Sequence, residues 1–163
     1  MNLTKKEKGV TMVEILVVLA ILMILITAST IILNPVEKKA RARDNKRFSD
    51  INTLDRMINE YLIDNGSYPD LENTLRESDT LPTGNISVDN ASDGWIDTDL
   101  SEYHSRLPTD PINDAIYKYY YYHNASSYEL NAVLEHSLEF AQDDGGDDLD
   151  RYEIGNDLTL ISP

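Results

Sequence analysis

A run of 24 residues near the N-terminus, Val10–Leu33, contains a single charged side chain, Glu14. As a helix it would be about 36 Å long, which exceeds the roughly 30 Å of a bilayer's hydrocarbon core. A carboxylate at the bilayer centre costs roughly 2.5–3.5 kcal/mol, so a chain that keeps one there needs a specific partner to neutralise it. The run therefore predicts a membrane helix at residues 10–33 with one functional acidic residue.

The residues before the run form a short basic leader, 1–9, which carries Lys5, Lys6 and Lys8 and ends at Gly9. The apolar run is too long for the core of a cleaved secretory signal, and no small-residue cleavage site follows it, so we expect the helix to be retained. The segment Lys38–Arg47 carries six basic residues against three in the leader, which conflicts with the positive-inside tendency. We still expect the bulk of the chain outside, because the leader is too short to be a domain.

The order of basic leader, Gly9, the residues Val10-Thr11-Met12-Val13-Glu14 and apolar helix resembles the N-terminus of type IV prepilins and type II secretion pseudopilins. The resemblance implies that prepilin peptidase cuts between Gly9 and Val10 and methylates the new amine of Val10. It also implies that the Glu14 carboxylate meets the Val10 amine of a neighbouring subunit, which sets the axial register of a filament. The family usually begins its mature chain with Phe, so Val10 departs from the pattern. The alternative is an ordinary signal anchor with a tolerated Glu14.

Residues 34–66 are expected to continue the helix outside the membrane, and 67–163 to form an extracytoplasmic globular head. Pro35 lacks an N–H and predicts a kink. Apolar residues then recur at helical spacing, and Asn65-Gly66 is a typical helix end. We expect this apolar stripe to be the surface on which the head packs: Phe48, Ile51, Leu54, Ile58, Tyr61 and Leu62.

The head pattern predicts a small antiparallel β-meander. Ile116–Tyr122 is dense in strand-forming Tyr, and Tyr128–Glu135 alternates apolar and polar residues. A third strand is expected at Tyr152–Ile154 or at Leu158–Ile161, a short helix at Leu100–Arg106, and a buried anchor at Trp95. The expected fold class is α+β: a long N-terminal helix, membrane-spanning in its first half, with the meander packed on its C-terminal half. Outward Tyr rings could alternatively bind partner subunits.

Charge is distributed unevenly over the 163 residues. The net charge is −15, but Phe48–Pro163 alone holds 25 acidic and 5 basic residues, a net charge of −20. An acidic head repels nucleic acid, so we expect no direct nucleic-acid binding from it. The basic segment Lys38–Arg47 could touch lipid headgroups or the acidic heads of neighbours, or be a solvated helix face. There is no Cys, so the C-terminal end cannot be held by a disulfide.

An acidic segment near the C-terminus is the one candidate metal site. Its carboxylates are hard oxygen ligands on a Gly-containing loop, which suits Ca²⁺, and the major pseudopilins bind calcium at a C-terminal loop of similar character. The spacing does not match an EF-hand, and a solvated acidic turn is the alternative. The candidate ligands are Asp143, Asp144, Asp147, Asp148 and Asp150.

These features favour a structural subunit of a type IV pilus or a type II secretion pseudopilus. The resemblance implies four partners: copies of the same chain and other pilins, prepilin peptidase, an inner-membrane assembly platform and membrane lipid. It places the chain first in the cytoplasmic membrane as a single-pass protein and then in the filament. The alternative is a membrane-anchored extracellular binding module, with or without calcium dependence, that does not polymerise. No motif supports an enzyme, so we expect no catalytic residues.

Overall fold

The computed structural model describes residues 9–79 and 94–162, except for the side chains at 28 and 30–33. The sequence also predicts turns at Thr83-Gly84 and Asp93-Gly94, of which Thr83, Gly84 and Asp93 lie outside these ranges. The chain divides into two compact units, Met1–Lys38 and Lys39–Pro163. Each unit is treated separately below.

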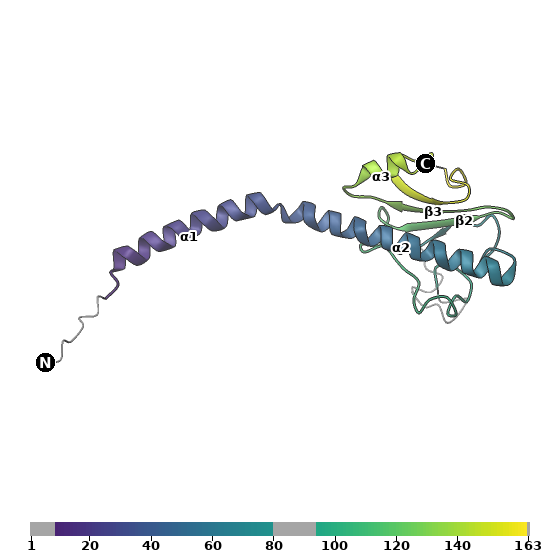
Figure 1. Cartoon of the computed structure of the whole chain (residues 1–163), viewed down its shortest axis with the longest axis horizontal. Coiled ribbons are helices and arrows are strands. Elements are labelled where there is room, and N and C mark those ends of the chain that lie inside the picture. The colour runs from purple at the N-terminus through teal and green to yellow at the C-terminus, as the bar shows by residue number, and fades with distance from the viewer. Residues whose placement is uncertain (1–8, 80–93, 163) are drawn as a thin grey trace. The chain divides into compact units, whose positions relative to one another are not determined.

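The first unit contains helix α1, Met12–Leu33, and the start of helix α2, Pro35–Asn65. Asn34 separates them in a left-handed conformation with φ 34°, so the backbone breaks directly before Pro35, as predicted (Figure 1). Every large apolar side chain from Val13 to Ile26 is at least 46% exposed. None of the helices in the described ranges is both long enough and apolar enough to cross a membrane.

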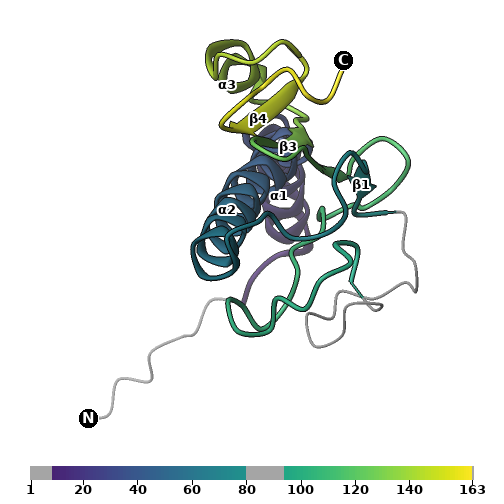
Figure 2. The same cartoon turned by 90° about the vertical axis from the view of Figure 1, so that its right-hand side faces the viewer.

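The second unit is a four-stranded antiparallel sheet beside the rest of α2. The strands are β1 (Arg76–Glu77), β2 (Tyr119–His123), β3 (Tyr128–Val133) and β4 (Arg151–Gly155), in that spatial order. The short helix α3, Leu138–Asp143, connects β3 to β4, and Figure 2 shows it beside β4. This arrangement confirms the predicted α+β fold with a meander.

The core of this unit lies between α2 and one face of the sheet. The predicted stripe supplies Ile51, Leu54 and Ile58, all fully buried. Tyr119 and Tyr121 point from β2 into the same core, while Tyr120 and Tyr122 alternate to the other face and are half-buried. Half of the tyrosine side chains on β2 therefore lie in the core. The sheet-side and loop-side members of the core are Tyr119, Tyr121, Tyr128, Leu130, Ala132, Trp95, Ile96, Leu100 and Leu107.

Two local predictions need correction. The β2 strand begins at Tyr119 and not at Ile116, because the Asp114 carboxylate accepts the N–H groups of Ile116 and Tyr117 and holds them in a turn. The helix predicted at Leu100–Arg106 is wrong. It is a single turn in which the Leu100 carbonyl accepts the N–H groups of Tyr103 and His104.

The third predicted strand forms at the first of the two alternatives, as β4, and extends that range by one residue at each end. Trp95 is fully buried, as predicted, and its indole N–H donates to the Pro108 carbonyl at 2.9 Å.

Candidate functional site

The predicted processing and assembly residues lie together at the exposed start of α1. Gly9 and Val10 are exposed, and no atom lies within 4 Å of where a Gly9 side chain would be. Thr11 caps the helix: its Oγ1 accepts the Glu14 N–H at 3.2 Å, and its own N–H donates to Glu14 Oε2 at 3.4 Å. This reciprocal capping box satisfies two backbone N–H groups at the helix start. In the uncleaved chain, the Glu14 carboxylate therefore has a local partner.

The head contains a buried ionic centre that the sequence analysis did not single out. Arg47 is completely buried, and its Nε and Nη2 donate to the two Asp110 carboxylate oxygens at 2.5 and 3.0 Å. Its Nη1 donates to Asp44 at 2.8 Å and to Glu135 at 2.7 Å. The guanidinium carbon also lies 4.8 Å from the centre of the Tyr117 ring. One arginine thus joins α2 to the loop before β2 and to the chain after β3.

Asp44 holds the chain that leaves β3. Its carboxylate accepts the backbone N–H groups of Glu135, His136 and Ser137 at 2.8–3.0 Å. Burial tends to raise the pKa of Asp44, but these three donors and Arg47 outweigh burial and lower it. Glu135 also has a lowered pKa, first because Arg43 donates to it and then because Arg47 does.

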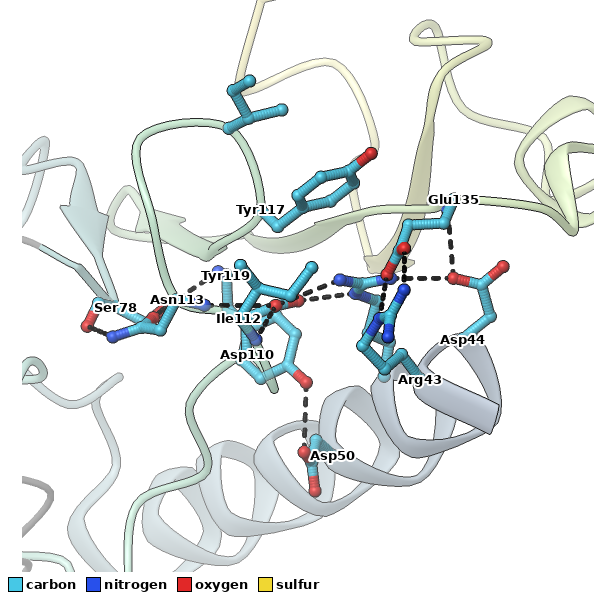
Figure 3. A network of polar contacts seen from close by, with 12 residues as sticks. Arg43, Asp44, Asp50, Ser78, Asp110, Ile112, Asn113, Tyr117, Tyr119 and Glu135 are labelled. Carbon is cyan, nitrogen blue, oxygen red and sulfur yellow. Dashed lines mark hydrogen bonds and ion pairs between the residues drawn. The ribbon is translucent and has the colours of Figure 1, made fainter. Parts of the chain in front are cut away.

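The centre continues toward the sheet through Asp50 and Asp110. Tyr119 donates its hydroxyl to Asp50 at 3.0 Å, and Asp110 accepts the N–H groups of Ile112 and Asn113 (Figure 3). Asn113 and Ser78 are in turn hydrogen-bonded side chain to side chain at 2.7 Å. All these groups are bonded to other protein groups, so the centre holds α2, the loop before β2 and the chain after β3 together.

The basic segment Lys38–Arg47 is therefore only partly a solvated face. Arg47 is buried and Arg43 pairs with Glu135, while Lys46 pairs with Asp50 at 2.5 Å and stays 61% exposed. One signal could have revealed Arg47: it lies one helical turn before Ile51, so the buried stripe runs through it.

The acidic segment runs from the end of α3 into a loop that contacts β4. Asp143, Asp147 and Asp150 are exposed, while Asp148 is buried. The Asp144 carboxylate accepts the N–H groups of Gly146 and Glu153, and Asp148 pairs with Arg151 at 3.1 Å. Within residues 9–79 and 94–162, no three Asp, Glu, His or Cys side chains converge as a metal-binding group. The calcium prediction stays untested by this geometry.

Two family comparisons cover most of the chain. Residues 4–30 match the prokaryotic N-terminal methylation motif, which includes Gly9, Val10 and Glu14. Residues 34–151 match type II secretion system protein G. The chain belongs to the protein G family. It is a pseudopilin with a prepilin-type N-terminus, as the resemblance implied. The match to protein G covers α2, the ionic centre and β1–β3.

Curated relatives agree with this assignment, and each is named "Type II secretion system core protein G". The Pectobacterium carotovorum protein is 36% identical over 65% of this chain and 62% of its own length. The Escherichia coli protein is 33% identical over 68% of this chain and 70% of its own length. The Pseudomonas aeruginosa protein is 28% identical over 93% of this chain and 96% of its own length. No solved structure gave a significant match.

Proposed function

We propose that this pseudopilin is a structural, non-catalytic subunit of a type II secretion pseudopilus, cleaved between Gly9 and Val10 and assembled through Glu14. The observation that carries the proposal is the match of residues 4–30 to the methylation motif, with Gly9 and Val10 exposed directly before α1. The expected partners are copies of the chain, other pilins, prepilin peptidase and an inner-membrane assembly platform.

The surface of α1 supports the same proposal. Its apolar side chains are exposed along the helix, and a contiguous apolar surface of this size marks contact with a membrane or with other protein chains. We propose that α1 is a single membrane pass before assembly, with the acidic head outside the cytoplasm. In the filament the α1 helices would then cover one another.

Assembly can be tested separately from helix capping at Glu14. Glu14→Gln keeps a side chain that can accept from the Thr11 N–H but removes the charge that would pair with a Val10 amine. Thr11→Ala is the matched control, because it removes the cap and keeps the carboxylate. We expect Glu14→Gln to reduce the yield of sheared filaments at least tenfold, with the protein still in the membrane fraction, and Thr11→Ala to reduce it far less.

The outcomes discriminate the two functions considered. Wild-type filament yield from Glu14→Gln would remove the proposed assembly role. Absence of filaments from the wild-type chain in a host with a complete secretion system would favour the non-polymerising, membrane-anchored binding module.

Processing has its own measurement. Mass spectrometry of the protein from its native membrane should show a chain that begins at Val10 and carries one N-methyl group. An intact leader, or a chain cut after Leu33, would contradict the proposed processing.

We propose calcium binding at the acidic loop as a separate property of the head. The supporting observation is chemical: five carboxylates lie in eight residues around Gly145, whose φ of +90° lies in the region that favours glycine. Calcium that binds only the folded head raises its melting temperature by mass action. Replacing both Asp147 and Asp148 with Asn should remove most of that shift.

A further inference from the structure

A basic surface cavity of about 390 Å³ lies between α2 and the loop before β2. Three basic side chains line it, Lys46 from α2 and His104 and Arg106 from the loop. This concentration of basic groups is unexpected, because Phe48–Pro163 holds 25 acidic residues and only 5 Lys or Arg. A positive cavity on a negative head attracts anions at one defined place, while the rest of the surface repels them.

The Arg106 guanidinium has no partner of its own. Its side chain is exposed at the cavity, and among the described residues no hydrogen bond or ion pair involves it. A guanidinium presents five N–H donors in a planar fork that matches an oxyanion, and all of them are available here. The other four basic residues of Phe48–Pro163 each pair with a carboxylate: Arg56 with Glu60, Arg76 with Asp70, Lys118 with Glu77 and Asp79, and Arg151 with Asp148.

The carboxylate in the lining, Asp50, does not cancel this positive charge. Its Oδ1 accepts from Lys46 at 2.5 Å and its Oδ2 accepts the Tyr119 hydroxyl at 3.0 Å, so both oxygens are occupied. Asp50 is also only 4% exposed. Lys46 stays 61% exposed, and an ammonium has three N–H donors, so two of them remain for a ligand.

Neutral donors and a fixed backbone complete the cavity. Ser49 on α2 and Thr109 on the loop line it, and their hydroxyls have no bonded partner among the described residues. The His104 Nδ1 lies 2.8 Å from the Arg106 carbonyl, which fixes the turn that carries Arg106. The Pro108 carbonyl accepts the indole N–H of Trp95 at 2.9 Å and anchors this wall to the core. The donors are therefore positioned before any ligand binds.

We propose that this cavity binds a phosphate group, with Arg106 and Lys46 as charged donors and the Ser49 and Thr109 hydroxyls as neutral donors. Hydrogen bonds from charged donors to an oxyanion are short and strong. A phosphate group has oxygens on several sides, so donors from both walls can reach it at once, whereas a planar carboxylate has only two oxygens. The same donors serve free phosphate and the phosphate of a lipid headgroup, and the experiment separates these two sources.

A bound phosphate would join α2 to the loop before β2 at a second place. Inside the head, Arg47 already joins these elements through Asp110. At the surface, Lys46 and Arg106 lie on opposite walls of the cavity and approach no common partner in the chain itself. A phosphate between them would supply that partner, and because it binds only the folded head, it should raise the melting temperature by mass action.

The test is titration of the full-length chain in a phosphate-free neutral detergent with inorganic phosphate at constant ionic strength. Binding is followed by isothermal calorimetry and by the fluorescence of Trp95, which is the only tryptophan and is bonded to the cavity wall. We expect Arg106→Gln to weaken phosphate binding at least tenfold. It should leave the unfolding midpoint without phosphate unchanged, since Arg106 has no partner to lose.

Two variants control for charge alone. Arg56→Gln removes the same charge from α2, but Arg56 is 59% exposed and does not line the cavity, so it should change the affinity less than twofold. Thr109→Val keeps every charge and nearly the same shape but removes one donor, and it should weaken binding at least threefold.

A second arm identifies the source of the phosphate. The titration is repeated with the chain in nanodiscs of phosphatidylglycerol. If a lipid headgroup occupies the cavity, the response to inorganic phosphate should disappear in the nanodiscs and return in detergent. If the ligand is free phosphate, the response should be the same in both. Either result supports a phosphate site.

Three results would overturn the proposal. One is no phosphate binding at millimolar concentration by a chain whose circular dichroism shows a folded head. Another is an equal response to acetate or chloride at the same ionic strength, which would mean general screening of charge. The third is equal weakening by Arg106→Gln and Arg56→Gln, or no weakening by Thr109→Val, which would mean that no built cavity is involved. None of these results depends on filament assembly, so they leave the proposed function unaffected.

Discussion

Replacing Arg47 with Met should be among the most damaging single changes to the head. Met matches the length of the Arg47 side chain as far as Nε but removes a charge that contacts three carboxylates, those of Asp44, Asp110 and Glu135. Asp110 would keep only the N–H groups of Ile112 and Asn113, and it is 3% exposed. Removing one member of a buried ion pair typically costs about 3–5 kcal/mol, because the other charge stays buried without compensation.

That loss is large compared with the stability of a typical domain, about 5–15 kcal/mol. For a unit of this size it corresponds to a fall in melting temperature of roughly 10–20 °C. The assay is urea unfolding followed by the fluorescence of Trp95, which is the only tryptophan and is fully buried. A shift in the unfolding midpoint with an unchanged slope would report the loss directly.

Arg43→Met is the matched control. Arg43 also pairs with Glu135, but its side chain is 31% exposed, so water can replace the lost partner. We expect a much smaller loss of stability than for Arg47→Met. Adding Asp110→Asn to Arg47→Met should recover part of the loss, since it removes the uncompensated charge. Two results would refute the reasoning: equal losses of stability for Arg43→Met and Arg47→Met, or a loss below about 1 kcal/mol for Arg47→Met. A buried unpaired charge should lower the free energy of unfolding by more than that.

Two further predictions concern the same unit. The pKa values of Asp44 and Glu135 are lowered from 3.8 and 4.5, so the stability that these carboxylates contribute is present at pH values above 3.8 and 4.5 and is lost as the pH falls through the lowered pKa values. Urea unfolding midpoints measured from pH 6 to pH 2.5 should show this loss of stability. The loss should be smaller in Asp44→Asn. Tyr128→Phe should lower the free energy of unfolding by about 1–3 kcal/mol in the same assay, because the buried Tyr128 hydroxyl donates to Asp55 and accepts from Asn59. A change below a few tenths of a kcal/mol would show that water takes the place of the lost hydroxyl.

The sequence predicted those parts of the fold that have a strong local period. The stripe at Ile51, Leu54 and Ile58 follows the helical repeat and gives the correct helix and the correct buried face. The density of Tyr gives the correct strand. The two-residue strand β1 could not be predicted, because Arg76–Glu77 is too short to show a period. It is a strand only because β2 is there to pair with it.

The sequence did not indicate the ionic centre, because its members are far apart in the chain. Arg47 meets Asp110 across 63 positions and Glu135 across 88. A basic residue on a helix near a membrane is normally solvated, and only the sheet's position on α2 makes this one buried. The burial of Glu129 on β3 and Glu153 on β4 was also missed. Polar residues in an alternating strand are expected to face water, and here the acidic loop and the C-terminal segment cover them.

The buried face of α2 also explains why the head needs charged groups inside. Its buried positions, Asp44, Arg47, Asp50, Ile51, Leu54, Met57 and Ile58, follow one continuous helical stripe that changes from charged to apolar near Ile51. An apolar stripe alone could slide by one helical turn, about 5.4 Å, and still bury similar area. Such a slide would separate Arg47 from Asp110 and Glu135 and take its charge away from both carboxylates. The charged half of the stripe therefore fixes the register of the sheet on the helix, while the apolar half supplies most of the burial.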